Sequence, residues 1–218
     1  MYPKIIHQIW IGSCQPPNWC INSWKINYVN KYPEWKYILW TEKELNNLEM
    51  VNREIYNKEP TLRGKSDIAR LEILYKYGGI FLDADSIWIN NKNLEILLKE
   101  AKDFSIFCAL EPDKLPKFIA NGVIGSKPRQ SLMLDLINHI NKTYTKKKSN
   151  NSHPYSIWKV TGPLPLNNIF NCDNIKVFPS FYFFPEGFVK GNINFKIDDI
   201  RKKFPNSFMY QYWLSHYN

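Results

Sequence analysis

Two aspartates, Asp83 and Asp85, follow directly after the apolar residues 80–82 and stand two positions apart. An extended backbone points such residues to the same side, so their carboxylates are expected to lie close together. Neighbouring carboxylates repel each other and resist joint ionisation, and a divalent cation removes that penalty. Mg²⁺ and Mn²⁺ favour one or two carboxylates together with phosphate oxygens. The pair therefore predicts a metal site for a phosphate-bearing ligand, the alternative being a strand end with two solvated aspartates.

A second charged pair, Asp67 and Arg70, precedes these aspartates in the chain. At 100° per residue, Ile68, Leu71 and Leu74 fall on one side of a predicted helix. Asp67 and Arg70 project from the same side, in what is predicted to be the first turn. A charge on an apolar face must be paired or must bind a ligand. These two residues are therefore the second part of the predicted site.

The elements that position both pairs form one continuous block. Ser66 is expected to cap a helix over residues 66–77, and Gly78 and Gly79 supply its end and a turn. Residues 80–82 are a short apolar run typical of a strand covered on both faces. In open α/β sheets, ligands bind outside the carboxyl ends of the strands. The block therefore places Asp83 and Asp85 where a binding site is expected.

Strand and helix patterns alternate along the rest of the chain. Thr41 and Glu44 form a capping-box pattern that starts a short helix. The alternation predicts an α/β fold with a parallel or mixed sheet and helices on both faces. Strands are predicted at residues 5–11, 35–40, 86–90, 104–110, 121–126 and 207–213, and helices at 19–32, 94–102, 129–143 and 161–170.

Length and composition set outer limits on the function. The 218 residues suit a single domain, 1–218, and the net charge of +9 favours anionic partners such as nucleotide diphosphates or anionic lipids, although base bias towards Lys codons would give the same charge. The four cysteines lack metal-ligand spacing, which predicts reduced thiols and a cytoplasmic protein. Signal-peptide and membrane-spanning patterns are absent from the sequence, so any membrane contact is expected to be peripheral.

The segment SDIARLEILYKYGGIFLDADSIWI closely resembles the DXD-containing glycosyltransferase family 32. That family includes α-mannosyltransferases and capsular polysaccharide transferases, and it is related to the glucosyltransferase domains of clostridial toxins. The stretches PKIIHQIWIG, YILWTE, NGVIGS and TGP add weaker similarity. The resemblance implies a GT-A-like fold. It also implies metal-dependent transfer of a sugar, with retention of configuration, from a nucleotide sugar to a glycan, lipid-linked or protein acceptor.

The resemblance also implies roles for individual residues. Asp85 is expected to bind Mn²⁺ or Mg²⁺, and Asp83 to meet the ribose or the metal. Asp67 would accept hydrogen bonds from sugar hydroxyls, and Arg70 would reach the sugar or the phosphates. The donor is expected to be a UDP-sugar rather than a GDP-sugar. The remaining expectations are base stacking by Trp10, a sugar pocket lined by Asn121 and Gly122, a phosphate contact by Trp213, and a third metal contact from either Gln211 or His216.

Two other functional classes stay open at the level of sequence. A metal-dependent nuclease or phosphoryl-transfer enzyme shares the carboxylates and the positive charge, but it would need a lysine or further carboxylates near the metal. A non-catalytic basic protein that binds glycans or nucleic acid would explain the charge and the aromatic residues. It would leave Asp67 and Arg70 without a role. On the preferred interpretation as a glycosyltransferase, nucleic acid is not expected as a partner.

Overall fold

A computed structural model describes residues 1–112, 118–149, 157–169, 175–187 and 194–214. Within these residues a six-stranded sheet has the order β2-β1-β3-β6-β5-β7. All its strands except β6 run in one direction, so the predicted mixed, mostly parallel sheet is confirmed. The strands are β1 (Ile5–Ile9), β2 (Lys36–Trp40), β3 (Gly79–Leu82), β5 (Ile106–Leu110), β6 (Ile119–Ser126) and β7 (Ile175–Phe178).

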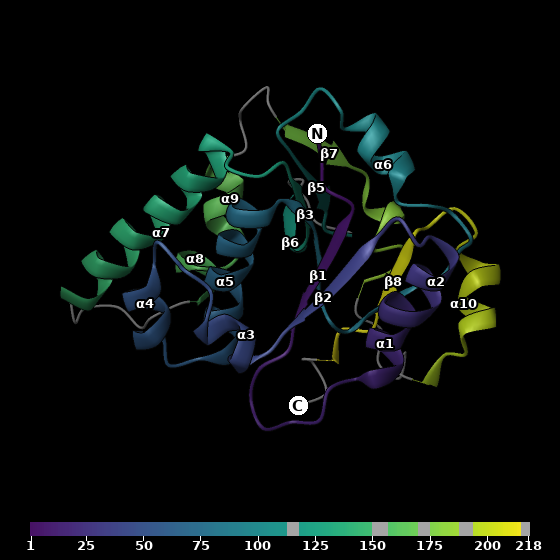
Figure 1. Ribbon diagram of the computed structural model, residues 1–218, viewed down its shortest axis with the longest axis horizontal. Coiled ribbons are helices and arrows are strands. Elements are labelled where there is room, and N and C mark those ends of the chain that lie inside the picture. Colours follow the sequence, from purple (N-terminus) through teal and green to yellow (C-terminus); the bar gives the residue numbers. More distant parts are fainter. Residues whose placement is uncertain (113–117, 150–156, 170–174, 188–193, 215–218) are drawn as a thin grey trace.

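The strands divide their side chains between two apolar cores. In β3, Phe81 packs into one core, whereas Ile80 and Leu82 pack into the other, as alternation along a strand requires. Figure 1 shows the two groups of helices on either side of the sheet. The first core is covered by α3 (Glu42–Asn46), α4 (Arg53–Lys58), α5 (Leu62–Tyr77), α7 (Ser131–Ser149), α8 (Ile157–Val160) and α9 (Pro163–Ile169).

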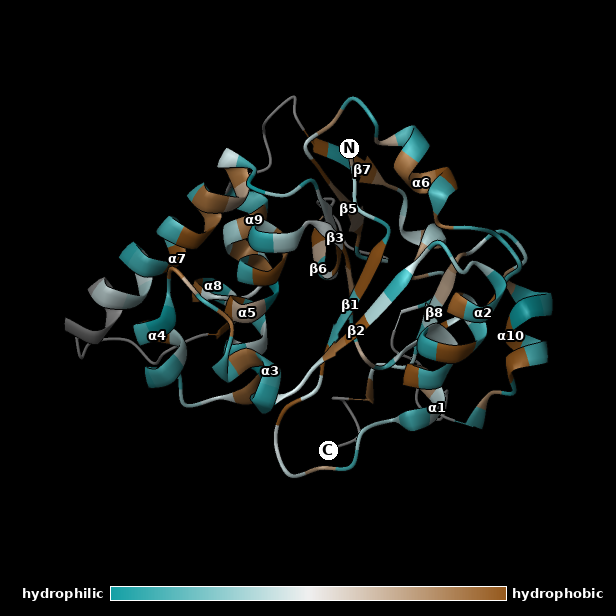
Figure 2. Ribbon diagram, in the orientation of Figure 1, coloured by the Kyte–Doolittle hydropathy of each residue, from teal (hydrophilic) through white to brown (hydrophobic). Residues whose placement is uncertain are grey.

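The opposite core lies under a helix that changes its winding. The predicted helix over 19–32 is formed by α1 (Asn18–Asn22), a π-helical segment (Ser23–Tyr28) and α2 (Val29–Lys31). The same side of the sheet carries α6 (Glu95–Glu100), a 3₁₀ turn (Ser180–Tyr182) and α10 (Ile197–Lys203). In Figure 2, α7 and α10 show alternating hydrophobic and hydrophilic bands, as amphipathic helices do. No helix in the described part of the chain is long and apolar enough to cross a membrane.

A small second sheet joins the middle of the chain to residues near its carboxyl end. Strand β4 (Ser86–Trp88) pairs in antiparallel fashion with β8 (Met209–Gln211). The register sets Ser86 opposite Gln211. Since β4 directly follows the two aspartates, this pairing brings Gln211 beside them.

Helix α5 begins earlier than the sequence pattern indicated. It starts at Leu62, and Thr61 is its cap, with the Thr61 hydroxyl accepting a hydrogen bond from the Gly64 amide at 3.1 Å. The prediction that Ser66 caps this helix is therefore wrong, because Ser66 lies inside it. Gly64 is tolerated within the helix since the Glu59 carboxylate packs where a Cβ would stand, at 2.4 Å. Asp67 and Arg70 thus project from the middle of α5 and not from its first turn.

Candidate active site

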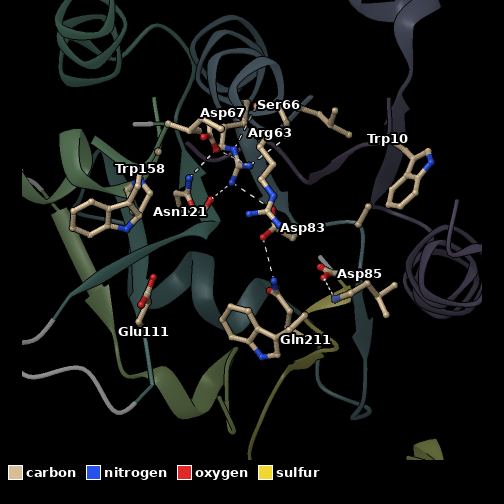
Figure 3. Close-up of a pocket in the computed structure, with 18 residues that line it drawn as sticks. Trp10, Arg63, Ser66, Asp67, Asp83, Asp85, Glu111, Asn121, Trp158 and Gln211 are labelled. Carbon is tan, nitrogen blue, oxygen red and sulfur yellow. Dashed lines mark hydrogen bonds and ion pairs between the residues drawn. The ribbon is translucent and has the colours of Figure 1, made fainter. Parts of the chain in front are cut away.

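A pocket of about 560 Å³ opens at the carboxyl ends of β1 and β3. The predicted site residues that line it are Trp10, Asp67, Arg70, Asp83, Asp85, Asn121, Gln211 and Trp213. Gly122 is not part of the lining, and His216 lies outside the described residues. Most of the predicted residues therefore meet at the carboxyl ends of the strands, as expected for an open α/β sheet. Figure 3 shows how the labelled residues are arranged.

The Arg70 guanidinium is the centre of a buried charged cluster. Its Nη2 lies 3.1 Å from Asp67 Oδ1, and its Nη1 lies 3.4 Å from Asp83 Oδ1 and donates to the carbonyl of Asn121. The guanidinium also stacks over the Phe81 ring, with Cζ 4.5 Å from the centroid. A delocalised cation suits this half-apolar environment because it combines directed hydrogen bonds with a face that packs on an aromatic ring. Arg70 is thereby held in one orientation.

Asp67 is fully engaged on the same side of the pocket. Besides the ion pair with Arg70, its Oδ1 accepts from Asn121 Nδ2 at 2.9 Å and its Oδ2 accepts from the Thr161 hydroxyl at 3.3 Å. Burial raises the pKa of Asp67 to about 6, Arg70 opposes this rise, and Asp83 adds to it. Asp67, Arg70 and Asn121, called the charged cluster below, thus form a preorganised polar wall.

The two aspartates lie in a turn and not in the extended backbone that the spacing suggested. The Asp83 carbonyl accepts from the Ser86 amide at 3.2 Å and from the Ser86 hydroxyl at 2.7 Å, which closes the turn. The same carbonyl accepts from Gln8 Nε2 at 3.0 Å. Ser86 directs the chain out of the main sheet, so the extended prediction fails after Leu82. Both aspartates nevertheless line the same pocket.

Gly122 has a different role from the one expected. A Cβ at this position would lie 2.6 Å from Asp83 Oδ2, and the Gly122 carbonyl accepts from the Asp83 amide at 3.0 Å. The glycine therefore makes room for the Asp83 carboxylate and not directly for a ligand. It lies within β6, whose amino-terminal part reaches this edge because β6 is antiparallel to β3.

Asp85 and Gln211 stand together opposite the charged cluster. Asp85 Oδ2 accepts from the Leu214 amide at 2.9 Å, and burial, reinforced by the Asp83 charge, raises the pKa of Asp85 to about 7. Gln211 is 5% exposed, and its Nε2 donates to Asp83 Oδ2 at 3.2 Å. Its Oε1 is buried and receives no hydrogen bond from the described residues. An unsatisfied buried acceptor beside two carboxylates that repel each other indicates a missing positive charge or donor.

These donor atoms fit a divalent cation. Asp83, Asp85 and Gln211 Oε1 would supply hard oxygen ligands. Among the described residues, no cluster of three His, Cys, Asp or Glu side chains suited to a metal occurs, so the protein alone would not fill the coordination sphere of a cation. This arrangement matches the way Mg²⁺ is held by one or two carboxylates while phosphate oxygens and water fill the other positions.

Several residues in or beside the pocket were not singled out as site residues from the sequence. Glu111 directly follows β5, and the rule that placed Asp83 at a strand end could have found it. Thr161 lies in the TGP stretch, which was noted only as a weak similarity. Gln8, a fully buried amide in β1, carried no signal of its contact with Asp83. Trp158 and Ser66 also line the pocket, and nothing in the sequence pattern singled out Trp158.

Comparison with known proteins finds similarity to glycosyltransferases. The family described as "Glycosyltransferase sugar-binding region containing DXD motif" matches residues 18–102. Inositol phosphoceramide mannosyltransferase 3 of Schizosaccharomyces pombe is 29% identical over 177 residues, covering 78% of this chain and 45% of that protein. An uncharacterised glycosyltransferase, L373 of Acanthamoeba polyphaga mimivirus, is 35% identical over 133 residues, covering 59% and 51%. The chain thus spans about half the length of these curated relatives.

The fold is shared with solved glycosyltransferases. The PaToxG glycosyltransferase superposes with a TM-score of 0.58 at 18% identity, covering 77% of this chain and 68% of that one. At this identity the likeness concerns the GT-A fold alone. The matched region contains both the DXD turn and the helix that carries Asp67 and Arg70. Residues 18–102 of this chain are therefore similar to the glycosyltransferase family whose sugar-binding region contains a DXD motif, and the chain has the fold of solved glycosyltransferases.

Proposed function

We propose that this chain, acting as a single domain, transfers a hexosyl group from a nucleoside diphosphate sugar to a hydroxyl-bearing acceptor, with Mn²⁺ or Mg²⁺ as cofactor. One observation carries the proposal. A single pocket combines the hydrogen-bonded charged cluster with two carboxylates and an amide oxygen that retain binding capacity. The first set suits neutral hydroxyls, and the second suits a cation that accompanies a diphosphate.

In this proposal, different residues bind different parts of the donor. Asp83, Asp85 and Gln211 would hold the cation, which supplies Lewis-acid stabilisation of the departing diphosphate. Asp67 would accept hydrogen bonds from sugar hydroxyls, since each carboxylate oxygen has more than one acceptor site. Arg70 holds Asp67 and Asp83 in place through its ion pairs. Trp10, which directly follows β1, would offer its ring to the base.

The identity of the donor and acceptor is part of the proposal. The resemblance to the family favours a UDP-sugar and retention of anomeric configuration. The name of the fission-yeast relative makes mannose the first sugar to test and an inositol-containing lipid the first lipid acceptor. Glycan and protein acceptors belong to the same proposal.

A donor panel tests the proposal. UDP- and GDP-sugars, including the mannosyl and glucosyl forms, are incubated with the chain and Mn²⁺, and the products are separated by chromatography. We expect release of an intact nucleoside diphosphate, with little release by the Asp85→Ala variant. Release of inorganic phosphate or a nucleoside monophosphate would point to phosphoryl transfer instead. No release and no metal-dependent nucleotide binding would remove the proposal altogether.

A further inference from the structure

Trp158 is a large exposed aromatic residue within the pocket. It lies in α8, is 44% exposed, and contributes to the pocket lining. Its ring stacks on that of Phe118, with centroids 5.3 Å apart and planes inclined by 12°. Parallel stacking covers one face of the indole. Apolar surface left open inside a concave pocket is a feature of ligand sites more than of ordinary protein surface.

The stacked pair is held firmly by its neighbours. The Glu111 amide donates to the Phe118 carbonyl at 2.7 Å, which ties the end of β5 to the start of β6. Asn167 of α9 then accepts from the Ile119 amide at 2.8 Å and donates to the Ile119 carbonyl at 3.0 Å. These bonds fix Phe118, and through it the plane on which Trp158 rests. A rigid platform loses little conformational entropy when a ligand binds.

Trp158 lies on the opposite side of the pocket from Trp10. Figure 3 shows the two indoles at opposite sides, with Asp67 and Asp83 between them. The proposed function places the base near Trp10 and the diphosphate at Asp83 and Asp85. It also places the sugar at Asp67. The wall formed by Trp158 and Glu111 then remains for the second substrate.

Resting on that proposed function, we propose that Trp158 and Glu111 form the acceptor subsite and bind a neutral, polyhydroxylated six-membered ring. The C–H face of the ring lies on the open face of the indole. The carboxylate of Glu111, which lines the same wall, accepts hydrogen bonds from ring hydroxyls. A carboxylate at this position selects against a phosphate on the part of the acceptor that contacts it.

Saturation-transfer NMR tests this subsite directly. Methyl α-D-mannopyranoside and myo-inositol serve as probes, in the presence of UDP and Mg²⁺. We expect the ring protons of at least one probe to receive saturation from the wild-type chain. Trp158→Ala should weaken binding about two- to tenfold, the range expected for an aromatic contact. Trp158→Phe should retain most of the effect, and Glu111→Gln should reduce it.

Trp19 provides a matched control. Its side chain is 47% exposed, close to the value for Trp158, but it does not line the pocket. Trp19→Ala should therefore leave saturation transfer unchanged. Equal loss in the Trp19 and Trp158 variants would show nonspecific contact with exposed indoles and would overturn the proposal. The absence of saturation of either probe by the wild-type chain would overturn it as well.

Thermal shift by UDP with Mg²⁺ separates this proposal from the proposed function. Trp158→Ala should keep the shift, and Trp10→Ala should reduce it. If Trp158→Ala removes the shift, Trp158 belongs to the nucleotide site and the acceptor assignment is wrong. If the wild-type chain shows no shift with any nucleotide but still binds a probe through Trp158, the proposed donor chemistry fails and the ring-binding subsite stands.

Discussion

The two sides of the pocket differ in how completely their polar atoms are satisfied. On one side, Asp67 has an ion pair with Arg70 and hydrogen bonds from Asn121 and Thr161. On the other, the carboxyl pKa of Asp85 is raised to about 7, and Gln211 Oε1 receives no hydrogen bond from the described residues. The first side is complete without a ligand, whereas the second has the features of a site that a cation completes.

This difference separates stability from activity. A buried, fully paired charge is costly to disturb because its partner is left without compensation. A buried carboxylate that is repelled by a neighbour already costs folding free energy, so its removal should affect function more than stability. Substitutions in the charged cluster should therefore lower both stability and ligand binding. Substitution of Asp85 should lower activity while leaving stability unchanged or higher.

The largest effect is expected from Asp85→Ala. Without this ligand the departing diphosphate loses several kcal/mol of stabilisation, so turnover of the nucleotide sugar should fall by about 10³-fold. The melting temperature of the metal-free variant should equal or exceed that of the wild type. Turnover within a few-fold of wild type would contradict the role given to Asp85.

Asp67→Ala, unlike Asp85→Ala, should lower stability. Removing Asp67 leaves Arg70 with Asp83 as its remaining ion-pair partner and should lower the free energy of unfolding by about 1–3 kcal/mol, as measured by urea denaturation. Asp67→Asn keeps the volume and an acceptor for Asn121 and should cost less. An unchanged denaturation midpoint for Asp67→Ala would show that the two sides of the pocket do not differ in the way described.

Gly122→Ala should displace the Asp83 carboxylate, since the new Cβ would lie 2.6 Å from Oδ2. Overpacking of this kind costs about 1–3 kcal/mol, and denaturation would measure it. A double-mutant cycle supplies the control, because Gly122→Ala should cost less when Asp83 is already alanine. Equal costs in both backgrounds would indicate that the glycine serves another contact.

Gln211→Leu should weaken Mg²⁺ binding by about tenfold, close to the effect of losing a supporting contact at a metal site. Stability without metal should change little, because the substitution also removes a buried unsatisfied oxygen. Titration of the Mg²⁺-dependent thermal shift measures both quantities. Gln211→Glu adds a charge and should strengthen binding, and weaker binding by that variant would argue against a cation near this position.

The smallest effect concerns pH. A folded-state pKa of about 7 for Asp85 lies above its ordinary value of 3.8, so the folded state binds a proton that the unfolded state lacks. The contribution of Asp85 to the free energy of unfolding is therefore largest below its ordinary pKa and is lost as the pH rises through 7. Between about pH 6.5 and about pH 8, the metal-free wild type should lose about 1 kcal/mol or less.

Asp85→Asn is the control for this pH effect and should lack most of the change. Asp67, whose pKa is raised to about 6, should contribute the smaller remainder, with the same sign. The buried His7 should not interfere, because burial lowers its pKa from 6.5 to about 4 and it titrates below this window. A rise in stability over the same pH range would contradict the sign of the Asp85 shift.

Local patterns in the sequence predicted the fold class and much of the pocket. Helical periodicity placed Asp67 and Arg70 on the buried face of α5. The strand-end rule placed Asp83 and Asp85 beyond the carboxyl end of β3. Both inferences use residues close together in the chain. The start of α5 was misjudged because Thr61 and Ser66 are both good helix caps. The packing of Glu59 against Gly64, which favours a glycine inside the helix, is not visible in the sequence.

Contacts between distant segments were beyond such reasoning. Glu72 of α5 is buried and accepts hydrogen bonds from the Val51 and Asn52 amides at 3.0 and 2.8 Å, a contact with a segment 20 residues earlier in the chain. Gln211 meets Asp83 only because β4 pairs with β8. The register of such a pairing depends on the whole fold, since propensity alone does not specify which strands meet.

The pairing of β4 with β8 also bears on how the chain is made. Domains synthesised on the ribosome emerge from the amino terminus, so residues 209–214 leave it after the rest of the pocket has emerged. Asp67, Arg70, Asn121 and Thr161 can meet before then, but Gln211 and the Leu214 amide cannot yet reach Asp83 and Asp85. A nascent chain therefore assembles the charged cluster first and adds the contacts from Gln211 and Leu214 last, so the pocket is not finished until synthesis has passed β8.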